Sequence, residues 1–504
     1  MRKVKVLHLV VLIGLASLPL AALDQVSVKR GTAERRGRGF EERSELSAPV
    51  REGGRLILRA DLGSVVIRPG ATDRFDCQVV LRAYTGSDAQ ARQIFGNFQL
   101  SARTLEAGGV YVTGQMQREQ RGRTSLEVEF EINLPQRFNL DVQTQGGDIT
   151  IESALQGEAR LTTAGGDVRT AEVSGPVKVE TAGGSITLGK AGNGVDARTA
   201  GGDIHTGDVQ GDTVLETSGG QIVTGQIAGS LRAQTAGGDV VIGGAAGRVT
   251  AETAGGQIQI GPTDGVVRAE TSGGSIRLRG ARGKVLVDTA GGSIDLLDVK
   301  AAVNASTAMG RILAQFDADK KTFSASQLKT SMGDVFVYLP VGLPLTIDAA
   351  IDAAAGHRIV SDFPLNIQGD QEALVLRTIR GQGALNGGGE ILHIRTVAGN
   401  IEIRKLDARA LEELKSREAS SWQRWRERWL ESEQRRLARE QQRLAREVQR
   451  KVGEQRQQIE REQERRAREI QRKAEEQQRQ MEREQERRAR ERQQEEQEHN
   501  RDRD

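Results

Sequence analysis

The chain has 504 residues, of which 72 are Lys or Arg and 69 are Asp or Glu, so its formal net charge is only +3. This balance gives no sign of a polyanionic partner and excludes nucleic acid from the expected partners. The chain also contains 60 Gly but only 9 Pro, 3 Trp, 3 Tyr and 10 Phe residues. Such a composition is typical of repeated tight turns and excludes a large, irregular, aromatic-rich core.

The first 22 residues have the layout of a secretory signal peptide. A positively charged start with Arg2 and Lys3 precedes a mostly apolar run over 8–20. We therefore expect residues 1–22 to direct export and residues 23–49 to form a linker. An uncleaved membrane anchor stays open as an alternative, although the apolar run is short for spanning a bilayer. The expected location is the cell envelope (periplasm or surface) or the medium.

Residues 50–145 predict irregular β-strands and one short helix. Stretches such as GRLILRADLGSVVIRPG and TSLEVEFEINLP have strand composition, whereas SDAQARQIFGNFQ begins with the good N-cap Ser87. Cys77, in RFDCQVV, is the only cysteine and cannot form an intramolecular disulfide. We interpret it as a small buried strand residue, with an intermolecular disulfide as the alternative.

An 18-residue repeat fills residues 146–335, and the stretch TAGGDVRTAEVSGPVKVETAGGSITL contains its glycine corner twice. A threonine precedes each corner, with one first step of 19 residues and then steps of 18: Thr144, Thr163, Thr181, Thr199, Thr217, Thr235, Thr253, Thr271, Thr289 and Thr307. The second glycine of the corner keeps the same register: Gly147, Gly166, Gly184, Gly202, Gly220, Gly238, Gly256, Gly274, Gly292 and Gly310. A register kept over so many copies indicates a repeat architecture.

Within one repeat the apolar residues alternate, as Val177 and Val179 before the corner and Ile186 and Leu188 after it. Alternation with period two predicts two short strands, each with one buried face. The second turn of each repeat has a glycine, replaced once by asparagine, six positions before the threonine: Gly157, Gly175, Asn193, Gly211, Gly229, Gly247, Gly265 and Gly283. Because Asn tolerates positive φ better than other non-glycine residues, we infer a left-handed backbone at this turn.

Two short strands per repeat bury their apolar sides only when successive coils stack, so the fold class predicted is mainly β, a parallel β-helix or solenoid with 18-residue coils. Residues 50–145 are expected to form its irregular N-terminal cap and residues 336–406 its C-terminal end. We expect the threonines to face inward, where their hydroxyls hydrogen-bond along the stack.

The chain resembles a known bacterial family of putative adhesins of uncharacterised function, with glycine-rich β-strand repeats. The resemblance covers about residues 50–406 and is carried by FNLDVQTQGGDITI, by the repeated T-x-G-G-x-I corners, and by DFPLNIQGD with GALNGGGEILHIRTVAGNIEIRKL. It implies a β-solenoid at the cell envelope or surface. It supplies no catalytic residues.

The glycine corners do not match known ligand loops. In GGDVRTAEV, Val168 and Thr170 stand where the calcium-binding nonapeptide needs its second Gly and its Asp. A phosphate-binding loop needs a helix after its glycines, whereas a strand follows here. We therefore expect no metal and no cofactor, and interpret the polar residues after the glycines as an exposed corner.

A carbohydrate-active β-helix enzyme is the main alternative function. Such an enzyme needs a local breach of the repeat where carboxylates or His side chains converge. The histidines His205, His357, His393 and His499 lie in unlike contexts without metal-ligand spacing, so no catalytic residue is predicted.

Residues 407–504 form an Arg-, Glu- and Gln-rich tail, predicted to be a long charged α-helix. Its larger apolar residues recur every 11 positions: Leu437, Val448, Ile459, Ile470 and Met481. This thin stripe suits a solvated single helix or a weak coiled coil, and homo-oligomerisation through it stays open.

All three tryptophans lie at the start of this tail, in WQRWRERW. Trp422, Trp425 and Trp429 are spaced to share one helix face. They are either a docking face for a membrane or partner, or a cover for the open end of the solenoid.

The function expected from these observations is a non-enzymatic, exported β-solenoid that acts as an adhesin or structural scaffold. Its helical tail would attach it or join copies, and its partner would be a protein, a glycan or an envelope surface. Besides the enzyme, an envelope-associated sensor that binds a partner through the tail is an alternative.

Overall fold

The computed structural model describes residues 26–37, 39–117, 126–369, 377–412, 414, 416, 471–473, 475, 476, 479–481, 483 and 487. The chain divides into two units, Met1–Glu413 and Leu414–Asp504. The strands β1–β37 lie in the first unit, which is mainly β. The predicted signal peptide, most of the predicted tail helix and the three tryptophans lie outside the described residues.

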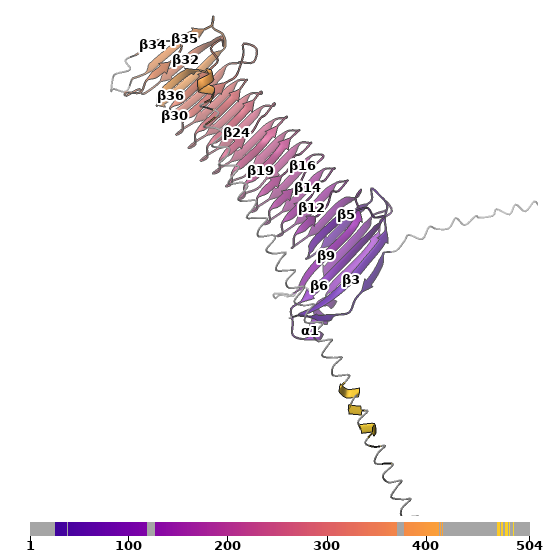
Figure 1. Ribbon diagram of the computed structural model, residues 1–504. Coiled ribbons are helices and arrows are strands. Elements are labelled where there is room, and N and C mark those ends of the chain that lie inside the picture. Colours follow the sequence, from indigo (N-terminus) through magenta and orange to yellow (C-terminus); the bar gives the residue numbers. More distant parts are fainter. Residues whose placement is uncertain are drawn as a thin grey trace, which may run out of the picture. The chain divides into compact units, whose positions relative to one another are not determined.

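The first unit is built on two long, mostly parallel sheets, as expected of a β-solenoid, and its coils stack side by side along a rod (Figure 1). Strands before the glycine corner form sheet B, whose regular part comprises β10 (Asn139–Thr144), β12 (Ala159–Thr163), β14 (Val177–Thr181), β16 (Val195–Thr199), β18 (Thr213–Glu216), β20 (Leu231–Gln234), β22 (Val249–Thr253), β24 (Val267–Thr271), β26 (Val285–Thr289) and β28 (Val303–Thr307). Strands after the corner form sheet A, whose regular part comprises β11 (Ile149–Ile151), β13 (Val168–Thr170), β15 (Ile186–Leu188), β17 (Ile204–Thr206), β19 (Ile222–Ile227), β21 (Val240–Ala245), β23 (Ile258–Ile260), β25 (Ile276–Ala281), β27 (Ile294–Val299) and β29 (Ile312–Phe316).

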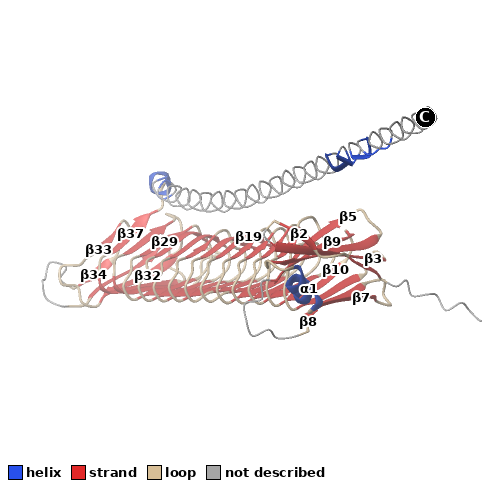
Figure 2. Ribbon diagram, turned by 90° about the horizontal axis from the view of Figure 1, so that it is seen from below, coloured by secondary structure: helices blue, strands red, loops and turns tan. Residues whose placement is uncertain are grey.

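Successive coils stack in register, as the 18-residue period predicts. Thr163 pairs with Thr181 and Thr181 with Thr199, so equivalent residues of neighbouring coils lie side by side. The second turn adds a third column of isolated parallel bridges, which begins with Leu155 and Val173. Figure 2 shows the two sheets as facing layers, and the apolar side chains between them form one continuous core.

The N-terminal end begins earlier than the sequence suggests, because residues assigned to a linker form strands. They are β1 (Ser27–Arg30), β2 (Glu34–Arg36) and β3 (Gly39–Pro49). β3 pairs antiparallel with β6 (Arg74–Ala83) from Phe40 to Pro49, so the linker prediction for residues 23–49 is wrong there. Its inward positions include Glu42 and Ser44, which are buried, and these polar residues hide the alternation from sequence reasoning.

The rest of this end mixes parallel and antiparallel pairs. β4 (Arg55–Ala60) and β5 (Ser64–Gly70) stack directly on β10 and β11, although about seventy residues separate them in the chain. The intervening strands are β6, β7 (Phe98–Thr104), β8 (Val110–Met116) and β9 (Leu126–Pro135). The predicted short helix is α1 (Asp88–Gly96), with Ser87 as its N-cap.

At the C-terminal end, the order of the strands within the sheets differs from their order in the chain. Its strands are β30 (Ser326–Met332), β31 (Val335–Leu339), β32 (Leu345–Ile351), β33 (Ile359–Ser361), β34 (Asn366–Gln368), β35 (Ile379–Leu385), β36 (Ile391–Ala398) and β37 (Ile401–Lys405). β36 lies between β30 and β32, and β37 lies between β31 and β33. The last coil of the chain is therefore inserted between two earlier ones.

Crowding, and not a left-handed backbone, explains the repeated glycines. The glycines and Asn193 of the second turn are absent from the described residues with clearly positive φ, so the inference of a left-handed turn is wrong. A Cβ added to Gly265 would lie 2.3 Å from the carbonyl oxygen of Gly247 in the preceding coil. The second corner glycines are equally crowded, since a Cβ on Gly184 would lie 2.0 Å from the Gly166 oxygen.

The threonine column faces inward, as expected, but its hydrogen bonds run through the glycine backbone. The hydroxyl of Thr181 donates to the Gly166 oxygen of the preceding coil at 2.9 Å. The same hydroxyl accepts from the N–H of Gly184 at 3.3 Å. The corner threonines from Thr163 to Thr289 therefore join two coils and close their own corner, without the direct hydroxyl contacts that we expected from the sequence.

Two threonines of sheet A offer a test of this interpretation, because their hydroxyls take no part in such hydrogen bonds in the described structure. The Thr170 and Thr206 hydroxyls are buried without a hydrogen-bond partner among the described residues. Thr206→Val should raise the free energy of unfolding by about 1 kcal/mol, since it removes an unsatisfied buried hydroxyl at nearly constant volume. Chemical denaturation would measure the change.

Thr224→Val is the matched control for that substitution. Thr224 is the next residue in the same column, and its hydroxyl donates to the Gly225 oxygen at 3.1 Å. This variant should gain no stability. A gain of equal size in both variants would contradict the proposed cost of the unpaired hydroxyl.

Cys77 is confirmed as a buried strand residue on β6, with 2% of its surface exposed. Burial, with the nearby Glu131 carboxylate, raises the pKa of its thiol. The thiol is therefore protonated at neutral pH, which disfavours both reaction and intermolecular exchange.

Candidate functional site

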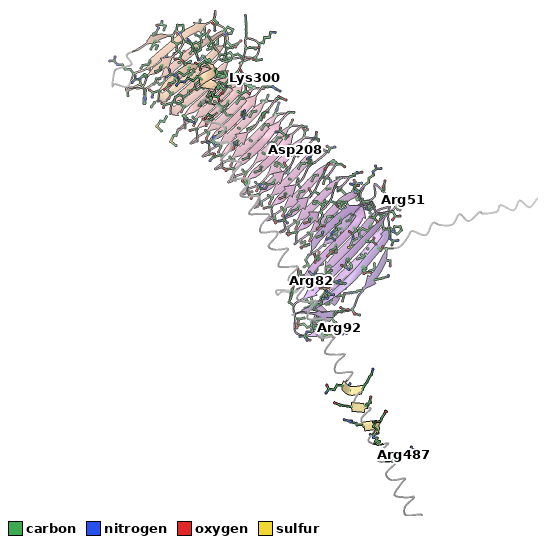
Figure 3. All side chains as sticks on the ribbon, in the orientation of Figure 1. Arg51, Arg82, Arg92, Asp208, Lys300 and Arg487 are labelled. Carbon is green, nitrogen blue, oxygen red and sulfur yellow. The ribbon has the colours of Figure 1, made fainter. Side chains whose placement is uncertain are left out.

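Functional chemistry on this rod must lie on outward rows of side chains, at breaches of the repeat, or at its ends, because the interior is apolar. Charged side chains cover the rod along its length, from Arg51 and Arg82 near one end through Asp208 to Lys300 (Figure 3). An outward row is defined here as equivalent positions of successive strands, which repeat about every 4.8 Å.

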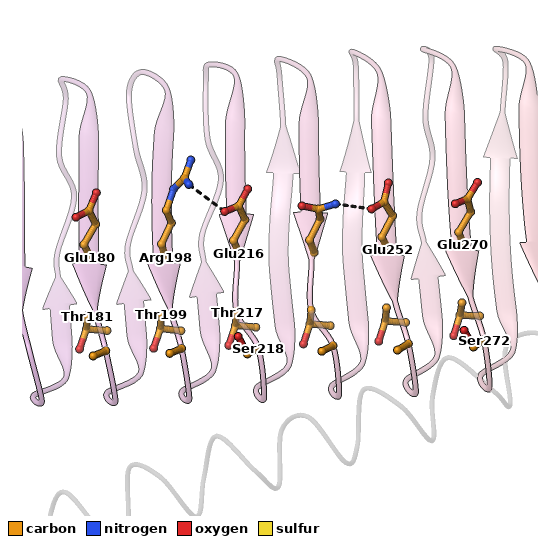
Figure 4. A pocket seen from close by; sticks show the side chains of 18 of the residues that line it. Glu180, Thr181, Arg198, Thr199, Glu216, Thr217, Ser218, Glu252, Glu270 and Ser272 are labelled. Carbon is orange, nitrogen blue, oxygen red and sulfur yellow. Dashed lines mark hydrogen bonds and ion pairs between the residues drawn. The ribbon is translucent and has the colours of Figure 1, made fainter.

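An open groove of about 1140 Å³ runs along sheet B. Figure 4 shows its repeating lining, in which each coil supplies one outward polar side chain and the corner threonine beside it. The outward side chains, from β12 to β26, are Thr162, Glu180, Arg198, Glu216, Gln234, Glu252, Glu270 and Asp288.

Charges in this groove are largely compensated within the protein. Arg198 contacts the Glu216 carboxylate of the next coil at 3.0 Å, and Gln234 hydrogen-bonds Glu252. Glu270 contacts Arg268 on its own strand. These contacts stabilise the stack, and they leave few groups in the groove to bind a charged ligand.

The polar residue after each glycine corner also serves the stack. The Asp167 carboxylate accepts from the backbone N–H of Ser185 at 2.8 Å, and Asp203 accepts in the same way from Gln221 at 2.9 Å. Among the described residues, no group of three or more His, Cys, Asp or Glu side chains is placed to hold a metal ion. These carboxylates are therefore backbone acceptors between coils.

The regular repeat is interrupted between β29 and β30, where the loop 317–325 replaces the usual turn. Asp298, in the adjacent coil, has a left-handed backbone with φ 54°. Burial raises the pKa of its carboxyl, and Asp317 adds to the effect, although Lys300 opposes it. Lys300 contacts Asp317 at 3.1 Å. The two carboxyl groups of Asp298 and Asp317, at an interruption of the repeat, are the kind of arrangement that the enzyme alternative requires. The sequence pattern does not identify this pair.

Asp298→Asn should raise stability at neutral pH. A raised pKa in the folded state means that stability from this carboxyl is present below its ordinary pKa and is lost as pH rises through the folded value. The uncharged amide of asparagine removes this loss of stability with rising pH, and asparagine tolerates the left-handed backbone. Thermal unfolding at neutral and acidic pH would measure the difference, which should shrink as the pH falls.

Asp319→Asn is the control of opposite sign in the same loop. Hydrogen bonds from Thr322, and from the backbone of Lys321, hold the pKa of Asp319 below its ordinary value. Its contribution is therefore present above the unfolded pKa and is lost as pH falls, so the amide should lower stability at neutral pH. Stabilisation by both substitutions would contradict the assignment for Asp298.

The C-terminal end of sheet B carries a polar cluster on its outer face. The Asp348 carboxylate on β32 accepts from Gln382 on β35 at 3.1 Å and lies 3.0 Å from Nδ1 of His393 on β36. The hydrogen bond from Gln382, followed by that with His393, lowers the pKa of Asp348. These residues come from three chain segments, and only the interleaved strand order brings them together.

The residues considered from the sequence do not converge. His205 lies on β17 in sheet A, and His357 lies in the loop before β33. His393 alone joins a cluster, with Asp348. Trp422, Trp425 and Trp429 lie outside the described residues, so their docking role stays a prediction.

The stacked coils define the class of protein as a parallel β-solenoid, and three solved structures with similarity to the chain come from bacteria. A putative adhesin from Bacteroides fragilis is 17% identical over 50% of this chain and 95% of its own, with a TM-score of 0.26. A putative cell adhesion protein from Clostridium sporogenes is 10% identical over 72% of this chain and 98% of its own, with a TM-score of 0.14. A putative adhesin from Parabacteroides distasonis is 9% identical over 58% of this chain and 94% of its own, with a TM-score of 0.22.

These matches confirm the predicted resemblance to putative adhesins as a likeness between structures. No protein-family model matches the sequence, and no curated protein matches it either. In the part of the chain that the structure describes, no helix has the length and apolar character needed to cross a membrane.

Proposed function

We propose that the protein is a non-enzymatic, exported β-solenoid of the cell envelope or surface that acts as an adhesin or structural scaffold. One observation carries this proposal: coils in register repeat the same outward positions along a rod. Such a rod offers an extended surface with many equivalent contacts. The tail, from residue 407, attaches the rod or joins copies of it.

Localisation and binding of the mature full-length chain test this proposal. We expect the protein in envelope or surface fractions, and we expect the purified, labelled chain to bind bacterial cells or isolated envelopes saturably. A cytoplasmic location, or no saturable binding, would contradict the adhesin role. A variant with Trp422→Ala, Trp425→Ala and Trp429→Ala separates the tail from the rod, because only tail-mediated attachment should be lost.

The carbohydrate-active enzyme is the alternative with a specific structural feature, the acidic pair at the breach. Incubation of the full chain with envelope polysaccharides, followed by measurement of reducing ends, distinguishes it. Release that Asp298→Asn abolishes would favour the enzyme over the adhesin. Absence of release, together with saturable binding, is the result that we expect.

A further inference from the structure

The outer face of sheet B changes its charge pattern at the C-terminal end. The outward row that holds Glu270 and Asp288 continues through Ser306 on β28, which pairs with Lys329 on β30. Lys329 pairs with Arg395 on β36. The same row that is acidic along the groove therefore becomes basic at the end.

Arg380 continues this basic row, and one small residue, Ala350, separates it from Arg395. Arg395 pairs with the buried Ala350 on β32, and Ala350 pairs with Arg380 on β35. We name Lys329, Arg395 and Arg380 the basic row; all three are exposed. Since neighbouring strands lie about 4.8 Å apart, the first two cations occupy consecutive positions, and the third follows across one gap.

Among the described residues, the three side chains of the basic row lack the close ion pairs that many other cations of this face form, although the charge of Arg395 helps to lower the pKa of Asp348. Arg59 contacts the Asp141 carboxylate at 2.7 Å, and Arg198 contacts that of Asp196 at 2.8 Å. Within the described parts of the chain, Lys329, Arg395 and Arg380 form no ion pair. Three exposed cations in one row repel one another, so an anionic ligand would relieve part of this repulsion.

A second row, of four amides, one imidazole and the Asp348 carboxylate, runs beside the basic row. We name it the amide row, and its members in spatial order are Asn304, Gln327, His393, Asp348, Gln382 and Asn366. It lies two residues away along each strand, or about 6.6 Å. Asp348 is held by Gln382 and His393, which fixes the orientation of neighbouring donors.

The opposite side of the basic row is apolar. Met309 follows β28, Met332 is the last residue of β30, and Val397 lies near the end of β36; these side chains are 60%, 57% and 40% exposed. Met309 and Met332 stand where other coils have the first corner glycine, a position with open space beside it. Cations thus lie between hydrogen-bonding amides and exposed apolar side chains.

We propose that this end of sheet B binds a linear acidic polysaccharide, whose carboxylates lie on the basic row and whose hydroxyls contact the amide row. The proposal rests on the proposed adhesin function and names its ligand class. Repeated negative charge matches successive cations, hydroxyls match amides, and the C–H faces of sugar rings suit the apolar corner. An anionic membrane would match the cations and the apolar corner but would leave the amide row without partners.

Binding of the full mature chain to polygalacturonate tests the proposal, with neutral dextran as the uncharged polymer. We expect saturable binding to polygalacturonate that weakens with added salt, and none to dextran. Arg380→Ala combined with Arg395→Ala should weaken binding by about tenfold or more, because two charged contacts are lost. Titration calorimetry would measure the affinity.

Arg232→Ala combined with Arg248→Ala is the matched control. Arg232 is an exposed residue of β20 and Arg248 is an exposed residue of the turn before β22, so the control removes the same charge away from the basic row. It should leave the affinity within about twofold of the wild-type value. Equal melting temperatures of both variants would establish that neither change acts by unfolding.

Three results would overturn the proposal: no binding to polygalacturonate, equal weakening in both variants, or binding through the basic row to phosphatidylglycerol vesicles and not to polygalacturonate. The last result would make this end a membrane-binding surface. If cells are bound but polygalacturonate is not, the polysaccharide proposal fails and the adhesin function stands. If polygalacturonate is bound through the basic row but cells and envelopes are not, the adhesin function fails and the polysaccharide site stands.

Discussion

Gly256→Ala should destabilise the protein by about 3 kcal/mol or more, the upper end of the cost of overpacking. The added Cβ would lie 2.0 Å from the carbonyl oxygen of Gly238 and 2.4 Å from its carbonyl carbon. Both atoms belong to the backbone of the preceding coil, so no flexible side chain can move aside. The two coils must separate locally, which weakens the hydrogen bonds of both sheets. Denaturant unfolding would measure the loss.

Gly255→Ala is the control one residue away. Its added Cβ would have the Gly237 oxygen as nearest neighbour, at 3.5 Å, which is ordinary contact. Because Ala reduces the conformational entropy of the unfolded chain, this variant should be neutral or more stable by about 0.4–1 kcal/mol. Equal losses at both glycines would contradict crowding between coils as the reason for the second glycine.

Thr253→Val should lower the free energy of unfolding by about 2 kcal/mol. The Thr253 hydroxyl donates to the Gly238 oxygen at 2.9 Å and accepts from the N–H of Gly256 at 3.2 Å. Valine fills nearly the same volume but leaves this carbonyl and this N–H without their partner in a buried corner. The change in unfolding midpoint, at constant dependence on denaturant, would measure the loss.

Thr250→Val supplies the matched control on the same strand. Thr250 points outward from β22 and is only partly buried. The same chemical change should therefore alter stability by less than about 0.5 kcal/mol. A loss at Thr250 as large as at Thr253 would mean that strand preference, and not the corner hydrogen bonds, determines the effect.

The regular coils could be predicted from the sequence because one period determines both composition and register. The spacing of Thr163 and Thr181 predicts that they stack, and they do. The cause of the glycine pattern could not be predicted, because a one-dimensional pattern does not distinguish a left-handed backbone from a close approach of two chains. Only the distance between coils separates the two explanations.

The ends of the solenoid could be predicted only in outline, because their strands pair with strands that are distant in the chain. The alternation in β3 is hidden by Glu42, which is buried at an inward position. Lys329, Arg380 and Arg395 do not share the 18-residue spacing, so nothing in the sequence places them in one row. Net charge also hides them, since carboxylates distributed over the chain cancel their charge in the total.

The inserted last coil constrains how the protein can be built and how it can associate. A simple solenoid can add coils one after another from one end, whereas β36 and β37 must fit between strands that precede them in the chain. This end therefore cannot be completed until residue 405 has left the ribosome, and partly synthesised chains keep unpaired strand edges. Once it is complete, the short antiparallel β34 and the three-residue β33 are the outermost strands. Such short edge strands offer few unpaired backbone groups with which another rod could pair. The insertion that delays completion of this end therefore also limits end-to-end polymerisation.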